Sequence, residues 1–295
     1  MVRQLKESSE EMTFFEHLDD LRPHLWRSAV AVLVIGIVAF CCKGLIIDHI
    51  LFGPQSPDFP TSRFLCRLGE LFARMCAWLG GLFGTEWYVD PTTLCINQQS
   101  FNTINTSLAG QFNLHLRVSL ATAMVLGIPY LLWEFWQFVK PALTEREKAG
   151  TRMFVFYVSL CFFGGLLFGY FVIAPLSINF LANYNASEFI TNMIDVNDYF
   201  STVIGVSIAC AVVFQLPLLI YFLTRIGIIS SAFLKRYRRH ALVVLAVIAG
   251  IITPPDIFSL VLVTLPLYGL YECSIAIAAR VERHYREKEP VEAAS

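Results

Sequence analysis

Seven carboxylates lie within or beside long apolar stretches of this sequence, where an ionised side chain is expensive to accommodate. Glu134 and Glu272 fall inside such stretches, which suggests a function for them by default. Either could instead accept a structural hydrogen bond from a neighbouring helix, and Asp19, Asp20 and Glu147 could be solvated surface charges. Carboxylates in such places can bind protons or ions, or accept the planar fork of a guanidinium in two hydrogen bonds. The seven are Asp19, Asp20, Glu134, Glu147, Glu188, Asp256 and Glu272.

The sequence lacks the common motifs of nucleotide-hydrolysing, protease and metal sites. It contains no G-x-x-x-x-G-K-[ST], H-E-x-x-H or G-x-S-x-G, and none of its six histidines pairs with another at metal-ligand spacing. We therefore expect no enzyme activity, no metal and no cofactor. The net charge of -1 gives no general attraction to nucleic acid. Gly165 and Gly169 form a G-x-x-x-G, which is more typical of close helix packing than of function.

The composition is that of a membrane protein. Hydrophobic residues make up 56% of the 295 positions, and the mean hydropathy is +0.59. Only 15% of the residues are charged, against about 25% in a soluble domain. A soluble protein of this size cannot bury so much apolar surface, and a disordered chain would be more polar. Eight cysteines are too sparse for a secreted disulfide scaffold.

The apolar stretches predict an all-α polytopic membrane protein with six transmembrane helices, since crossing the hydrocarbon requires about 20 residues. The fifth stretch is short: at 1.5 Å per residue it covers only about 20 Å, so the bilayer must thin or neighbouring helices must shelter it. The predicted spans are 25–47, 114–139, 153–175, 199–224, 240–253 and 257–279. They divide the chain into a segment 1–23, a membrane domain 24–279 with a long loop 48–113, and a tail 280–295.

The distribution of Lys and Arg predicts the orientation. Four lie near the N-terminus, four after the second span, five after the fourth and four in the tail, so 17 of the 22 fall on one face. That face is expected to be cytoplasmic, with both termini inside and the loop 48–113 outside. Residues 1–22 are polar, so we expect no signal peptide.

The loop 48–113 is predicted to contain an amphipathic helix over residues 64–83. Arg67, Glu70 and Arg74 share one face of it, and a helix of this kind would lie on the outer membrane surface or cap the bundle. A short re-entrant hairpin is the alternative. At most one disulfide can form among Cys66, Cys76 and Cys95, and the pairing stays open. The apolar positions, which repeat every three or four residues, are Phe64, Leu68, Leu71, Phe72, Met75, Leu79 and Leu82.

Short motifs occur in order from residue 14 to residue 272. Residues 14–22 read Phe-Phe-Glu-His-Leu-Asp-Asp-Leu-Arg, and residues 138–143 read Phe-Val-Lys-Pro-Ala-Leu, followed by Glu147 and Lys148. The later motifs are Phe168-Gly169-Tyr170-Phe171 with Pro175, Phe214-Gln215-Leu216-Pro217, Thr253-Pro254-Pro255-Asp256 and Leu270-Tyr271-Glu272. Together they resemble the TatC family, the receptor subunits of the twin-arginine protein translocase.

The resemblance implies a concave, glove-like bundle of six helices with cytoplasmic termini in the bacterial inner membrane. It implies a receptor for twin-arginine signal peptides, which forms homo-oligomers and assembles with single-span TatA-type and TatB-type subunits. Folded precursor proteins then cross the bilayer, driven by the proton-motive force. The alternative from the residues themselves is a proton-coupled secondary transporter of a small solute that uses Glu134, Glu188 and Glu272. The carboxylates outside the spans, and the lack of an internal repeat, argue against it.

The resemblance also implies roles for individual residues. Asp20 and Glu147 are the expected signal-peptide carboxylates, and Asp20 stands where the family usually has Glu. Pro23 is expected in the first turn of the first span. The other residues expected at the signal site are Arg22, Phe138 and Pro141. The polar residues expected to serve transport are Glu134, Glu188, Gln215, Asp256 and Glu272, and the prolines expected to be structural are Pro54, Pro175, Pro254 and Pro255.

Overall fold

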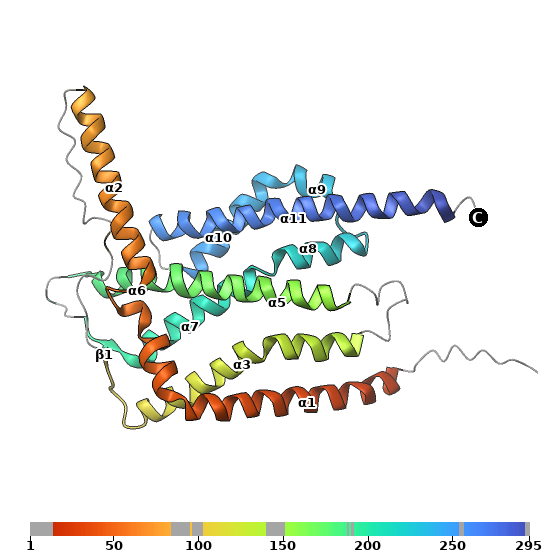
Figure 1. The fold of residues 1–295 in the computed structure, drawn as a ribbon, viewed down its shortest axis with the longest axis horizontal. Helices are drawn as coiled ribbons and strands as arrows, with labels where there is room; N and C mark the ends of the chain where they lie inside the picture. Colours follow the sequence, from red (N-terminus) through yellow and green to blue (C-terminus); the bar gives the residue numbers. More distant parts are fainter. Residues whose placement is uncertain are drawn as a thin grey trace, which may run out of the picture. The chain divides into compact units, whose positions relative to one another are not determined.

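The structure is a computed structural model that describes residues 14–83, 95, 103–139, 151–187, 189, 192–253 and 257–292 (Figure 1). The chain forms two compact units, residues 1–41 with 119–159, and residues 42–118 with 160–295. The elements in order are α1 (Phe14–Cys41), η1 (Leu45–Leu51), η2 (Gly53–Gln55), α2 (Pro60–Phe83), β1 (Thr103–Ile104), α3 (Gly110–Val139), α5 (Thr151–Phe168), η4 (Gly169–Ile173), α6 (Ala174–Asn183), β2 (Ile194–Asp195), α7 (Val196–Val213), α8 (Leu216–Arg225), α9 (Ser231–Arg236), α10 (Arg238–Ile252) and α11 (Ile257–Glu292).

Five helical stretches of the described residues are long and apolar enough to cross a membrane: 21–41, 110–138, 155–183, 196–225 and 259–283. They correspond to the first, second, third, fourth and sixth predicted spans. The predicted fifth span lies in α10, whose 15 residues make it too short to qualify by length. The expectation of an all-α fold holds for the long elements, and the described residues add one small parallel pair of strands, β1 and β2.

Several helix boundaries differ from the predicted spans. α1 begins at Phe14, so Pro23 lies inside the helix and not in its first turn. The first span was predicted to run to residue 47, but α1 ends at Cys41 and the π-helix η1 follows after Gly44. A break at Phe214 and Gln215 divides the fourth stretch into α7 and α8. Gly44 disfavours a continuous helix at the first of these breaks, and Pro217 lacks the N–H that the interior of a helix needs at the second.

Two prolines shape the packing of the larger unit, because a proline cannot donate to the carbonyl four residues earlier. Pro54 leaves the Ile50 carbonyl without that partner, and the Tyr170 hydroxyl donates to this oxygen at 2.6 Å. Pro175 does the same to the Phe171 carbonyl, which accepts from the Thr61 hydroxyl. Pro54 and Pro175 are both fully buried. Their predicted structural role therefore has a physical basis, since each frees a carbonyl that ties two distant segments together.

In the smaller unit, α1 packs against α3 through small residues. A Cβ added to Gly36 would lie 3.5 Å from Cβ of Ala123, and one added to Gly127 would lie 3.4 Å from a methyl group of Val32. Ala123 is completely buried. Short side chains allow helices to approach closely in a membrane, where apolar lipid provides little driving force for association.

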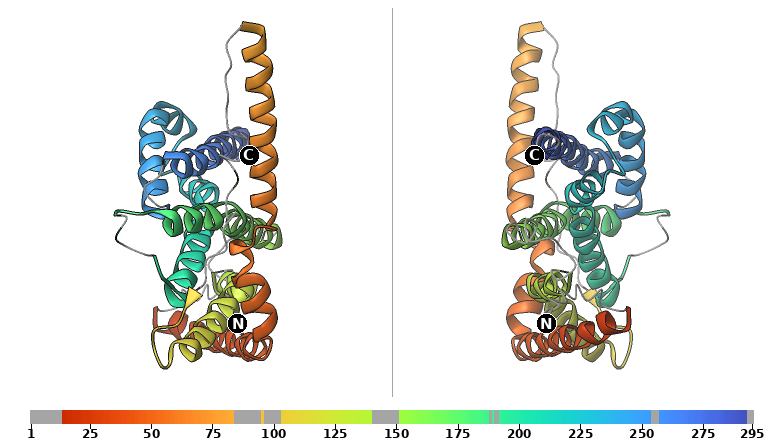
Figure 2. Two further views of the ribbon diagram at one scale, coloured as in Figure 1. Left: turned by 90° about the vertical axis from the view of Figure 1, so that its left-hand side faces the viewer. Right: turned by 90° about the vertical axis from the view of Figure 1, so that its right-hand side faces the viewer.

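The core of the larger unit lies between α7, α8, α10 and α11 (Figure 2). α11 packs along α8 and α10, and α7 packs against η4 and α6. The buried side chains of this core are Ile173, Val206, Cys210, Ile220, Leu234, Leu245, Ala249, Val263, Leu267, Tyr271, Ile275 and Ala278.

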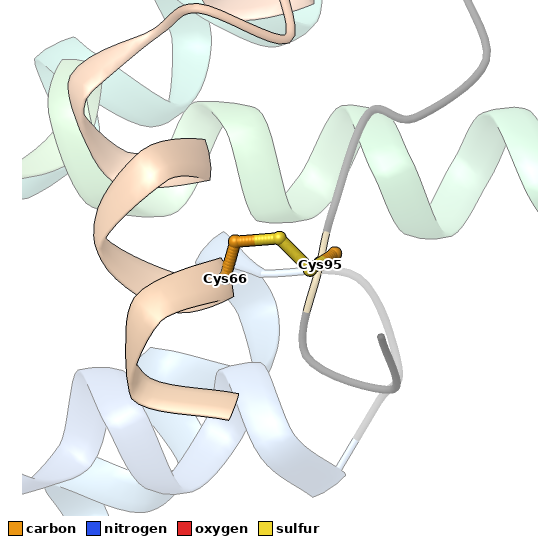
Figure 3. The surroundings of a disulfide bond; sticks show 2 residues. All are labelled: Cys66 and Cys95. Carbon is orange, nitrogen blue, oxygen red and sulfur yellow. A yellow bond between two sulfur atoms is a disulfide. The ribbon is translucent and has the colours of Figure 1, made fainter. Parts of the chain in front are cut away.

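α2 is a single continuous helix of 24 residues, which rules out a hairpin within residues 60–83 and confirms the predicted helix there. Figure 3 shows the disulfide that joins Cys66 on α2 to Cys95. Cys76 is buried and free. Of the three possible pairings among the loop cysteines, the structure therefore selects Cys66–Cys95.

The G-x-x-x-G motif has the packing role that its spacing predicts. A Cβ at Gly165 would lie 2.8 Å from Cα of Ala211, and one at Gly169 would lie 2.7 Å from Cα of Ser207. Both contacts are with the backbone of α7, which cannot move aside as a flexible side chain can. The two glycines therefore set the distance between the third and fourth apolar stretches.

We predict that Gly165→Val destabilises the protein by about 1–3 kcal/mol, because it overpacks this contact. Gly164→Val is the matched control, since a Cβ at Gly164 meets no atom within 4 Å. Thermal unfolding in detergent measures both variants. Equal melting temperatures for the two variants would contradict the proposed contact.

Candidate functional site

The opening motif, residues 14–22, forms the start of α1. Asp20 therefore lies on a helix, two residues before the exposed side chain of Arg22. The side chains of residues 14–20 are outside the described part of the structure, as are Glu147 and Pro141 altogether. Phe138 is half-buried in the last turn of α3. Because α1, the end of α3 and the start of α5 belong to one compact unit, the helices that carry Asp20 and flank residues 140–150 form one framework.

Glu134 lies in the same unit and is not a lone buried charge. Glu134 is only 6% exposed, and each of its carboxylate oxygens has a hydrogen-bond partner. Nδ1 of His24 on α1 lies 2.6 Å from Oε2, and the Tyr130 hydroxyl donates to Oε1 at 2.7 Å. The positive charge of Arg27 on α1 also acts on this carboxylate. Glu134 thus connects the end of α3 to His24 on α1, which lies four residues after Asp20.

Glu272 has a similar arrangement in the larger unit. The Arg238 guanidinium at the start of α10 donates to Oε2 at 2.7 Å, and the Tyr268 hydroxyl donates to Oε1 at 3.0 Å. The Glu272 side chain is one-third exposed, so this pair is more accessible to water than the pair at Glu134. The contact connects α10 to α11. Both apolar-stretch glutamates are therefore bound to a basic side chain and to a tyrosine four residues earlier.

The other residues predicted to serve transport are placed only in part. Gln215 lies at the junction of α7 and α8, where its backbone carbonyl accepts from the N–H groups of Leu218 and Leu219. Glu188, Asp256, Pro254 and Pro255 lie outside the described residues. Within the described residues, no group of three or more His, Cys, Asp and Glu side chains is arranged to hold a metal ion.

Asp195 organises a site that the sequence analysis missed. Its carboxylate accepts from the backbone N–H and hydroxyl of Thr106, at 3.1 and 2.6 Å, and from the N–H of Asn197 at 2.8 Å. The hydroxyl of Thr106, followed by the Asn197 N–H, holds the pKa of this carboxyl well below its usual value. Asp195 both caps α7 and closes the β1–β2 pair, so it joins the end of the long first loop to the start of the fourth apolar stretch.

The sequence contained a signal for the two glutamate clusters. In both, Tyr stands four residues before Glu, at Tyr130 and at Tyr268, which places the two side chains on one helix face. The basic partners were not predictable, because His24 is 110 positions from Glu134 and Arg238 is 34 positions from Glu272.

We predict that Glu134→Leu destabilises the protein by about 1–3 kcal/mol, because it leaves the partly buried His24 ring without its acceptor. Glu134→Gln should cost less, since an amide keeps an acceptor oxygen and nearly the same volume. Thermal unfolding of the purified protein measures the series. Glu272→Leu is the control at a more exposed pair, and a loss there as large as at Glu134 would contradict the importance of burial.

Comparisons with known proteins agree on one family. The family described as Sec-independent protein translocase protein (TatC) matches residues 16–266. The chain is 37% identical over 279 residues to the Sec-independent protein translocase protein TatC of Blattabacterium sp. subsp. Periplaneta americana, covering 95% of this chain and 99% of the relative. It is 36% identical over 273 residues to the TatC protein of Campylobacter jejuni, covering 92% and 96% of the two chains.

The fold agrees with the same family. A crystal structure of the twin arginine translocase receptor TatC superposes with a TM-score of 0.62 at 27% identity, covering 89% of this chain and 99% of that one. A second crystal structure of the receptor superposes with a TM-score of 0.56 at 26% identity. The match spans both units and nearly all the motifs quoted above, so this chain belongs to the TatC family of Sec-independent protein translocase proteins.

Proposed function

We propose that this chain is the signal-peptide receptor of a twin-arginine translocase that moves folded proteins across the bacterial inner membrane. The observation that carries the proposal is the family match over residues 16–266, supported by the similarity to a structure named as the twin-arginine translocase receptor. The same match favours protein transport over a carrier of small solutes. Glu134 and Glu272 support this choice, since each is held in a pair with a basic residue.

Recognition rests on Asp20 and Glu147. A twin-arginine signal presents two adjacent guanidiniums, and each carboxylate can accept one of them in two parallel hydrogen bonds. Two acceptors on separate segments discriminate against a single surface arginine. Arg22, Phe138 and Pro141 line or shape this site. The border of the membrane strengthens each contact, because the effective dielectric constant is lower there than in water.

Glu134 and His24 hold the recognition segments in place. Their pair joins α1 to the last turns of α3, so it fixes the helix that carries Asp20 relative to the helix that leads into residues 140–150. Glu134 is therefore a positioning residue in this proposal. Glu272 has the corresponding role between α10 and α11, and Glu188, Gln215 and Asp256 act during transport.

The proposed topology has six spans with both termini in the cytoplasm, and α10 is the short fifth span. Its 15 residues cover about 22 Å, less than the roughly 30 Å of hydrocarbon, so the bilayer thins beside α10. Pro254 and Pro255 close the outer hairpin to α11. TatA-type and TatB-type single-span subunits and further copies of this chain complete the translocase, and the proton-motive force drives transport without catalysis by this chain.

The recognition proposal predicts that Asp20→Asn and Glu147→Gln each weaken binding of a twin-arginine precursor. Loss of one member of a charged hydrogen-bonded pair costs about 2–5 kcal/mol, which corresponds to a loss of affinity of roughly 30-fold or more. Photocrosslinking or equilibrium binding of a labelled precursor to the purified protein measures the effect.

Three controls accompany this measurement. Asp20→Glu restores the residue usual in the family and should bind normally, and Asp19→Asn should matter less because adjacent residues point about 100° apart on a helix. Replacing both signal arginines by lysines should reproduce the loss, since an ammonium cannot form the two-pronged contact. Normal binding by the double variant of Asp20 and Glu147 would place the receptor site elsewhere.

The orientation predicts which positions a membrane-impermeant thiol reagent reaches in intact cells. Cys95 should be labelled only after reduction of its bond to Cys66. A cysteine at Ala149 should stay unlabelled until the cells are broken, because residues 140–150 are predicted to be cytoplasmic. Peptide mapping by mass spectrometry identifies the labelled sites, and the opposite pattern would reverse the topology.

A further inference from the structure

We propose that α2 is a membrane-surface helix, which inserts an apolar stripe into the boundary of the outer leaflet and binds lipid phosphates with its arginines. Only the choice of leaflet rests on the proposed orientation. A helix anchored to the bilayer at this point would give the translocase a fixed contact with the lipid beside its outer end.

The described part of α2 divides into three faces. At 100° per residue, Arg63, Arg67, Glu70 and Arg74 fall within about 60° of the circumference and are all exposed. A second face of about 60° is buried and consists of Ser62, Leu65, Gly69 and Cys76. Between them, an apolar face of about 100° is exposed, and its members are Phe64, Leu68, Leu71, Phe72 and Met75.

The first turn of α2 is held at the depth where a span leaves the hydrocarbon. Phe59, just before α2, stacks on Phe171 of η4, and the Thr61 hydroxyl donates to the Phe171 carbonyl. The apolar stretch of the third span runs from Val155 to Asn183, but the predicted third span ends at residue 175, four residues beyond Phe171, and residues 155–171 already cover about 24 Å along a helix. The hydrocarbon is about 30 Å thick, so this anchor lies close to the outer boundary.

The direction of α2 suits the membrane plane. Within the larger unit, α2 runs crosswise to α11, as both figures show (Figures 1 and 2). Since α11 contains an apolar stretch able to cross the bilayer, a crosswise helix that starts near the boundary lies along the surface. The Cys66–Cys95 disulfide adds a covalent tie in the second turn of α2.

The exposed faces match a bilayer better than they match another protein. Phe64 and Leu71 are 64% and 62% exposed, more than an isolated apolar stripe should leave to water. The arginine face borders this stripe, so Arg67 and Arg74 can reach lipid phosphates while the stripe enters the acyl boundary. Arg63 is already paired with Asp58 at 2.9 Å, which leaves Arg67 and Arg74 as the proposed phosphate contacts.

The test uses the full-length protein in lipid nanodiscs that contain phosphatidylglycerol with a photoreactive diazirine in its acyl chain. Trypsin cleaves after Arg67 and Arg74, so one peptide, residues 68–74, reports on the helix. We expect lipid adducts at Leu68, Leu71 and Phe72 and few at Glu70. A peptide without adducts, in a sample whose spans are labelled, would overturn the proposal.

Two variants with the same added charge separate the apolar face from the rest of the helix. Leu71→Glu should reduce labelling of this peptide about tenfold, because a charge is expelled from the acyl boundary. Ala77→Glu, at the edge of the arginine face, should leave the labelling of this peptide unchanged. Retention of the Cys66–Cys95 disulfide checks that each variant is folded. Equal labelling of both variants would contradict the proposed face, as would a protein–protein crosslink through Leu71 in native membranes.

Discussion

The structure depends on one constraint: within hydrocarbon, each polar group of the protein must find its partner inside the protein. Buried prolines impose the same requirement at the edge of the hydrocarbon, because each one removes the donor for a carbonyl four residues earlier. The freed carbonyls of Ile50 and Phe171 accept hydrogen bonds from the hydroxyls of Tyr170 and Thr61 instead. Groups that would be defects in an isolated helix thus become the contacts that join the first loop to the third apolar stretch.

The same constraint explains the two glutamates within apolar stretches. Each is paired with a basic side chain from another helix and with a tyrosine on its own helix. Such pairs add little net stability over well-packed apolar residues, but they fix which helices are neighbours and in what register. In the proposed receptor, these paired glutamates shape the framework, and recognition of guanidiniums is assigned to Asp20 and Glu147 instead.

The first loop contains the part of this chain that the common motifs do not account for. Its helix α2 is secured at one end by Phe59 and Thr61 and one turn later by a disulfide. Further along the chain, Thr106 and Asp195 join the end of the loop to the start of α7. The loop is therefore tied to the helices at both ends, while the arginine face and the apolar face of α2 remain exposed.

The sequence by itself determined the membrane class, the helix over residues 64–83, the family and six apolar spans, five of which lie in described helices long enough to cross a membrane, because each rests on composition, period or local motif. Tyr130 and Tyr268 were also visible as local partners of the two glutamates. Only the tertiary structure decided that His24 meets Glu134, that Cys66 pairs with Cys95 and that Asp195 closes β1 against β2. The physical reason is distance along the chain: helix periodicity relates residues three or four positions apart, whereas partners 29 to 110 positions apart meet only when the helices pack.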